Sequence, residues 1–88
     1  MAWTIELSQT AEKSLRKLDR HVAKRITQYL RGRVAQLENP RGLGKPLHAS
    51  LEDYWSYRAG DYRLICEIKD RTLVVLVVEI GHRSDVYR

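Results

Sequence analysis

The spacing of apolar residues changes once along this chain, and that change constrains the fold more than any other feature. In residues 8 to 38 apolar side chains recur every three or four positions, as in amphipathic helices. In residues 54 to 80 they alternate or run continuously, as in strands. Between them lies NPRGLGKP (39–46), whose two prolines and two glycines stop a helix and forbid a central strand. The chain therefore divides into a helical half and a β half.

Polar residues that can cap helices subdivide the first half. Residues 3 to 7 alternate between apolar and polar, which predicts a short strand with one buried face. Ser8 or Thr10 can begin a helix, and Asp19 can cap a second one. A tight turn near Asp19 predicts an antiparallel helical hairpin. Gly32 is a weak point late in the second helix, where it costs about 1 kcal/mol relative to alanine.

Two turn sequences divide the β half into three strands. Ala-Gly-Asp at 59–61 and Lys-Asp-Arg at 69–71 have tight-turn composition, and Gly81 is expected to end the last strand. The predicted order is β-α-α-β-β-β, a single α+β domain over residues 1–88 with two helices on one face of a mostly antiparallel sheet. A chain of 88 residues leaves room for one modest core.

Charge and cysteine usage narrow the function classes. Sixteen lysines and arginines against eleven acidic residues give a net charge of +5, which predicts a polyanionic or acidic partner unless it serves only solubility. The single cysteine, Cys66, excludes an internal disulfide, and its apolar surroundings predict a core position. The three histidines lack metal-ligand spacing, so no metal or other cofactor is expected. No apolar run is long enough to span a membrane and no signal peptide is evident, so a cytoplasmic location is expected.

A pair of arginines flanks the first predicted β turn. Arg58 and Arg63 should pair across it and project from the same face, which Tyr54 and Ser56 share by alternation. Two guanidinium groups side by side can clamp a phosphate, although pairing with nearby carboxylates as surface salt bridges is the alternative. Lys45 ends a GLGK segment that resembles part of a phosphate loop without the Walker spacing, and is a further candidate for binding substrate.

The tail after the last strand combines three chemically useful side chains. His82 can exchange protons near neutral pH, Arg83 can stabilise phosphorane charge, and Tyr87 can stack on a base. The alternative is that the histidine ends a strand, the tyrosine packs and the arginine is solvated.

Three segments resemble one protein family across nearly the whole chain. NPRGLGKPL, YWSYRAGDYRLICEI and VVEIGHRSDVYR are similar to segments of the RelE/ParE superfamily of toxins from type II toxin–antitoxin pairs, and more similar to RelE-type members. The resemblance implies a ribosome-dependent mRNA endonuclease. ParE-type members, which inhibit DNA gyrase without nuclease chemistry, supply the alternative, and an inactive relative that only binds its antitoxin is a third. Both active types are neutralised by an antitoxin that wraps the toxin.

The resemblance also implies residue roles. Arg63 would stabilise the scissile phosphate, Arg83 would act on the leaving group and Tyr87 would stack the substrate base. Arg58 matches a basic position on the same sheet face, and His82 matches a histidine that several relatives place before the closing arginine. The implied reaction is metal-independent attack of a ribose 2′-OH, which leaves a 2′,3′-cyclic phosphate.

One departure from the family pattern leaves the general base open. Tyr54 and Ser56 stand where the best-known RelE-type enzyme carries lysines, and neither is a good base at pH 7. Tyr54 is retained as a substrate-contacting candidate, and the proton-transfer role is predicted for His82. The expected partners are the ribosome, mRNA and a cognate antitoxin. The toxin itself is expected to be a monomer that can join a toxin–antitoxin heterotetramer.

Overall fold

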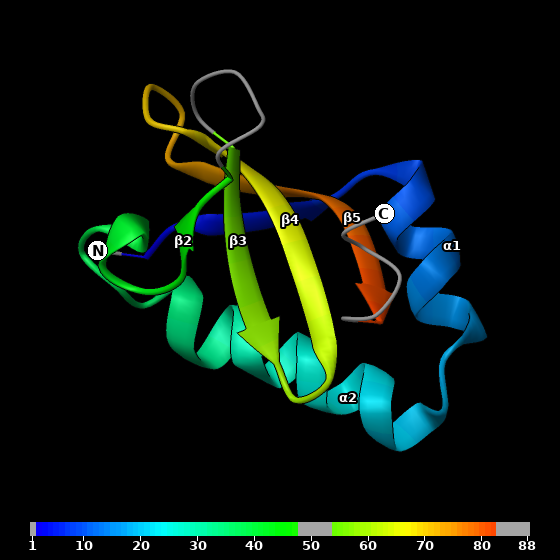
Figure 1. Ribbon diagram of the computed structural model, residues 1–88. Helices are drawn as coiled ribbons and strands as arrows, with labels where there is room; N and C mark the ends of the chain where they lie inside the picture. Colours follow the sequence, from blue (N-terminus) through cyan, green and yellow to red (C-terminus); the bar gives the residue numbers. More distant parts are fainter. Residues whose placement is uncertain (1, 48–53, 83–88) are drawn as a thin grey trace.

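The computed structural model describes residues 2–47 and 54–82, which form two α-helices against one five-stranded sheet (Figure 1). The helical half contains β1 (Thr4–Leu7), α1 (Gln9–Lys17), α2 (Arg20–Tyr29) and a π-helical turn (Leu30–Val34). The β half follows a 3₁₀ turn (Pro40–Gly42) and contains β2 (Lys45–Pro46), β3 (Tyr54–Ala59), β4 (Tyr62–Lys69) and β5 (Val74–His82). The predicted α+β architecture is confirmed, with the two-residue β2 as an added edge strand, a position that tolerates proline.

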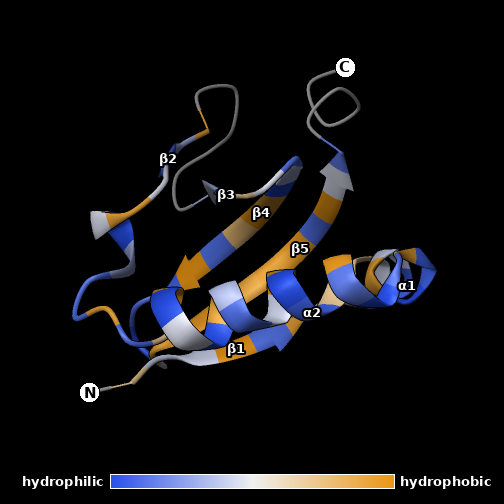
Figure 2. Cartoon of the chain, turned by 90° about the horizontal axis from the view of Figure 1, so that it is seen from below, coloured by the Kyte–Doolittle hydropathy of each residue, from blue (hydrophilic) through white to orange (hydrophobic). Residues whose placement is uncertain are grey.

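The helix caps lie at two of the residues that the sequence predicts. Ser8 Oγ accepts a hydrogen bond from the backbone N–H of Ala11 at 3.0 Å, and Asp19 Oδ1 accepts one from the N–H of His21 at 2.8 Å. The helices do not form the predicted side-by-side hairpin. They diverge from their shared turn, with α1 against β5 and α2 beneath the sheet, in both Figure 1 and Figure 2. Each helix buries its apolar stripe on the sheet rather than on the other helix.

The second helix ends in a π-helical turn around the predicted weak point. The N–H of Ala35 donates to the carbonyl of Leu30 at 2.8 Å, five residues back, so the turn is one residue wider than an α-helical one. Gly32 lies inside this turn with no atom near the place a Cβ would occupy. The predicted weak point and the π-helical turn therefore coincide at the end of α2.

The sheet has the order β1-β5-β4-β3-β2, with β1 parallel to β5 and the other pairs antiparallel. The last strand differs from its predicted bounds, residues 72 to 80. It begins at Val74 because Leu73 adopts a left-handed backbone with φ 56°. It also continues through Gly81 to His82, since these residues pair with Arg63 and Tyr62 of β4.

The core lies between the helices and one face of the sheet, here called the core face. Figure 2 shows the long apolar run of β5 behind α2. Tyr57, Leu64 and Cys66 are each at most 1% exposed, and Ile26 of α2 packs in the same cluster. Cys66 is thus a core residue as predicted, and its burial raises the pKa of the thiol well above its usual range. Among the described residues, no helix is long and apolar enough to cross a membrane.

Candidate functional site

The β3–β4 hairpin places two arginines directly opposite each other. Arg58 pairs with Arg63 in the antiparallel register, and the turn between the strands uses a positive φ of 63° at Gly60. Directly opposed residues have Cβ atoms about 4.5–5.5 Å apart on one face, where like charges destabilise the sheet. Arg58 is exposed and Arg63 is half-buried. A bound anion between the two guanidinium groups would turn this repulsion into attraction.

Two further candidates, Lys45 and Tyr54, share this side of the sheet with Ser56. Ser56 and Tyr54 alternate with Arg58 along β3, and Lys45 of β2 is the register partner of Ser56. We call this surface the arginine face; its members are Lys45, Tyr54, Ser56, Arg58 and Arg63. Lys45 is exposed and Tyr54 half-buried, whereas Ser56 is only 4% exposed. The prediction from side-chain alternation, that these hairpin residues project from one face, is therefore confirmed.

His82 lies on the opposite, core face. Its register partner is Tyr62, and the two rings meet edge to face with centroids 5.5 Å apart. The cause is a β-bulge: Ile65 pairs with Glu79 but Cys66 pairs with Val77, so β5 has an extra residue at this point. The extra residue reverses the alternation along β5. The structure therefore does not bring His82 onto one face with the arginine pair.

The remaining sequence-predicted site residues, Arg83 and Tyr87, lie outside the described residues. Their roles stay predictions. Within residues 2–47 and 54–82, no group of three histidine, cysteine or acidic side chains is arranged to hold a metal ion.

An ion pair that the sequence did not predict links residues 39–46, here called the connector, to the far end of the sheet. Arg41 Nη1 and Nη2 donate to Asp70 Oδ1 and Oδ2 at 2.9 and 3.0 Å. The Arg41 guanidinium holds the pKa of Asp70 below its usual range. The two residues are 29 positions apart and only the fold makes them neighbours, so no local pattern reveals the pair.

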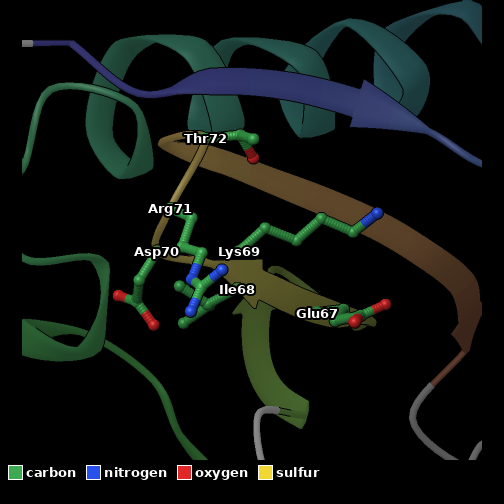
Figure 3. A pocket seen from close by; sticks show the side chains of 6 residues that line it. All are labelled: Glu67, Ile68, Lys69, Asp70, Arg71 and Thr72. Carbon is green, nitrogen blue, oxygen red and sulfur yellow. The ribbon is translucent and has the colours of Figure 1, made fainter.

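A hollow of about 490 Å³ beside this ion pair is lined by Glu67, Ile68, Lys69, Asp70, Arg71 and Thr72. Figure 3 shows the Asp70 carboxylate pointing away from Lys69, toward the connector that carries Arg41. The hollow lies at the β4–β5 turn, whereas the arginine pair lies at the other end of β4. Its wall mixes acidic and basic groups. We therefore take the arginine face, and not this hollow, as the candidate site.

A second surface feature is an apolar groove between β1 and the two helices. It encloses about 160 Å³ and is lined by Ile5, Leu7, Leu15, Thr27, Leu30 and Arg31. Leu7 is 37% exposed, the one large hydrophobic side chain among the described residues to be so exposed. Strand β1 is also an edge of the sheet. Such a groove suits an extended or helical segment with aliphatic anchors.

Comparison with known proteins places these features in a family. Residues 5–87 match the family model of the ParE toxin of type II toxin–antitoxin systems, parDE. The toxin RelG of Mycobacterium tuberculosis is 32% identical over 88 residues, covering 100% of this chain and 99% of RelG. The mRNA interferase toxin RelE of Escherichia coli is 32% identical over 90 residues, covering 99% of this chain and 92% of that toxin.

The fold agrees with the same family. The toxin–antitoxin complex RelBE2 of Mycobacterium tuberculosis contains a chain that superposes with a TM-score of 0.81 at 29% identity, covering 97% of this chain and 95% of that one. The resemblance drawn from the segment at 54–68 and the closing motif is thereby confirmed. This chain belongs to the ParE toxin family of type II toxin–antitoxin systems and is similar to its RelE-type members.

Proposed function

We propose that this toxin is an mRNA interferase that cleaves mRNA on the ribosome, in the cytoplasm, and so arrests translation. The observation that carries the proposal is the Arg58–Arg63 pair on one sheet face, in a domain with a net charge of +5. Paired guanidinium groups match phosphate oxygens bidentately. Similarity to the Escherichia coli mRNA interferase toxin over nearly the whole chain supports the same chemistry.

The proposed reaction is an internal transfer at one phosphate of the RNA. The ribose 2′-oxygen forms a bond to the neighbouring 3′-phosphorus while the bond from phosphorus to the 5′-oxygen of the next nucleotide breaks. A proton leaves the 2′-OH and one is delivered to the departing 5′-oxygen, so the products are a 2′,3′-cyclic phosphate and a 5′-OH. Arg63, with Arg58 opposite it, would stabilise the negative charge that grows on the phosphorane oxygens.

We propose His82 as the proton-transfer group of this reaction. Tyr54 and Ser56 occupy the positions on β3 where, by the resemblance, the best-known RelE-type enzyme carries lysines, and His82 is on the core face against Tyr62. The role predicted for His82 is tested by His82→Gln. A rate loss of about 100-fold with a flattened profile between roughly pH 5 and 8 would support it. A wild-type rate and profile would remove His82 from the reaction.

Primer extension on a reporter mRNA after induction of the toxin tests the proposed function. Cleavage at defined codons, lost in Arg58→Ala/Arg63→Ala, is the expected result. Intact mRNA combined with inhibited DNA supercoiling by gyrase would replace the proposal with the ParE-type activity. Intact mRNA without gyrase inhibition would leave a protein that only binds its antitoxin.

We further propose that the cognate antitoxin uses the apolar groove beside β1. The groove offers Leu7, Leu15 and Leu30 as contacts for aliphatic anchors, and Arg31 in its wall favours an acidic residue nearby. The structural relative RelBE2 was solved as a toxin–antitoxin complex, which supports a tightly bound antitoxin as the partner. The toxin alone is proposed to be a monomer, with a heterotetramer as the larger assembly.

A further inference from the structure

Lys45 reaches the arginine face from a different strand than the arginines. Its register partner is Ser56, and Arg58 lies two residues farther along β3 on the same face. Lys45 and Arg58 are thus diagonal neighbours, about 7–8 Å apart at the backbone. The lysine is exposed and carries its ammonium on a flexible four-carbon stem. By register, Lys45, Arg58 and Arg63 are all neighbours of Ser56 on this face.

The segment that carries Lys45 is fastened to β3 by two hydrogen bonds. The indole Nε1 of Trp55 donates to the carbonyl of Leu43 at 2.6 Å, and the hydroxyl of Tyr57 donates to the carbonyl of Pro40 at 2.6 Å. The Tyr57 hydroxyl is buried, and desolvation raises its pKa, so it remains a donor throughout the physiological range. Both bonds hold backbone that precedes β2.

Close packing at Gly44 adds a third restraint. Gly44 has a φ of 76°, and a Cβ there would collide with the carbonyl oxygen of Ser56 and lie 2.9 Å from Trp55 Nε1. The connector backbone therefore lies directly on β3, immediately before Lys45. Together with the Arg41–Asp70 ion pair, these contacts hold a segment rich in turn residues in one position. A lysine at its end is presented by a fixed backbone, as preorganised binding groups are.

We propose that Lys45 is the third phosphate-binding cation of the site, and that Trp55 is a positioning residue that acts through it. The arginine pair takes one phosphate of a single-stranded RNA, and Lys45 takes a neighbouring phosphate of the same strand. This inference rests on the proposed function for the identity of the substrate as RNA. The contact to phosphate itself is a property of the folded toxin, whether or not cleavage follows.

The test measures binding of a fluorescein-labelled 2′-O-methyl RNA hexamer, which has no 2′-OH to attack, across a series of salt concentrations. Loss of one phosphate contact on a single strand lowers the slope of log affinity against log salt by about 0.7. Lys45→Gln should lower the slope by that amount and weaken binding about tenfold at low salt. Lys45→Arg should bind as wild type. Lys69→Gln, which removes a lysine from the far end of β4, is the matched control and should leave the slope unchanged.

The role of Trp55 is tested by a double-mutant cycle. Trp55→Phe removes the indole donor to Leu43 and should weaken RNA binding several-fold, and this loss should vanish in the Lys45→Gln background. A loss of equal size in both backgrounds would show that Trp55 acts only on general stability. An unchanged salt slope for Lys45→Gln, or no binding of the hexamer by the wild-type toxin, would overturn the assignment of Lys45. If Lys45→Gln lowers the slope but the wild-type toxin cleaves no mRNA, the proposed function fails while the phosphate contact stands.

Discussion

Two arginines that face each other across a β hairpin are costly unless something negative lies between them. The register that opposes Arg58 and Arg63 follows from a turn fixed by Gly60, so the two charges cannot separate by a shift in pairing. No described residue places a carboxylate within ion-pair distance of Arg58. At the residue scale, the exposed Arg58 directly opposite Arg63 makes this end of the hairpin the candidate anion site.

Arg63→Ala should separate activity from stability. We expect single-turnover cleavage on mRNA-programmed ribosomes to fall about 100-fold or more, since the guanidinium would act on transition-state charge. The free energy of unfolding should fall by at most about 2 kcal/mol, because Arg63 is only half-buried. Arg16→Ala, on the exposed side of α1, is the control for loss of one positive charge. Undiminished cleavage by Arg63→Ala would contradict the phosphate assignment.

The Arg41–Asp70 pair predicts a pH-dependent contribution to stability. The folded protein lowers the pKa of Asp70, so the contribution is present above the unfolded pKa of about 3.9 and is lost as the pH falls through the folded value. Urea unfolding of Asp70→Asn should therefore show a loss of at most about 1 kcal/mol at pH 7, because the pair is exposed. The difference from wild type should shrink as the pH falls below about 4. Asp61→Asn serves as the control, and a difference that does not shrink on acidification would contradict the ion-pair origin.

At the scale of elements, the connector is the part of the chain whose role changes most between sequence and structure. Its composition predicts a loop. The segment nevertheless makes hydrogen bonds with the side chains of Trp55, Tyr57 and Asp70, each from the β half. It also contributes an edge strand to the sheet. Order in this segment comes from contacts with side chains far along the chain, not from local preference.

Alanine substitution at two glycines of the connector should have different effects on the stability of the protein. Gly44→Ala should destabilise the protein by about 1–3 kcal/mol, because it combines a positive φ with a Cβ that meets β3 backbone. Gly42→Ala should be nearly neutral, since nothing lies within 4 Å of its Cβ position and its φ is not positive. Thermal or urea unfolding of the purified variants measures both. Equal effects would show that the connector is not packed on β3 as described.

At the scale of the whole molecule, the domain offers two separate surfaces for two partners. The arginine face is built by β2, β3 and β4, whereas the apolar groove lies between β1 and the helices, across the sheet. An antitoxin segment in the groove and RNA on the arginine face would each make their own contacts. Variants of one surface should therefore leave the other function intact.

Leu7→Asp tests that separation. It places a charge in the groove and should weaken the complex with co-expressed antitoxin at least tenfold, as measured by dissociation rate, while cleavage by the free toxin is unchanged. Thr4→Asp, an exposed position on the same strand outside the groove, is the control. The association rate should fall as salt rises, because the net charge of +5 attracts an acidic partner. Wild-type affinity for Leu7→Asp would move the antitoxin site elsewhere.

The sequence alone determined those structural features that depend on residues close together in the chain. Apolar periodicity and caps located the helices, and a glycine turn between two alternating strands opposed Arg58 and Arg63, because such features act over a few residues. Tertiary structure decided the rest. The bulge in β5 places His82 on the core face. Packing on the sheet separates α1 from α2. The ion pair between Arg41 and Asp70 joins residues 29 positions apart. These outcomes depend on which distant segments pack together, and the free energy of that packing is not encoded in any local pattern.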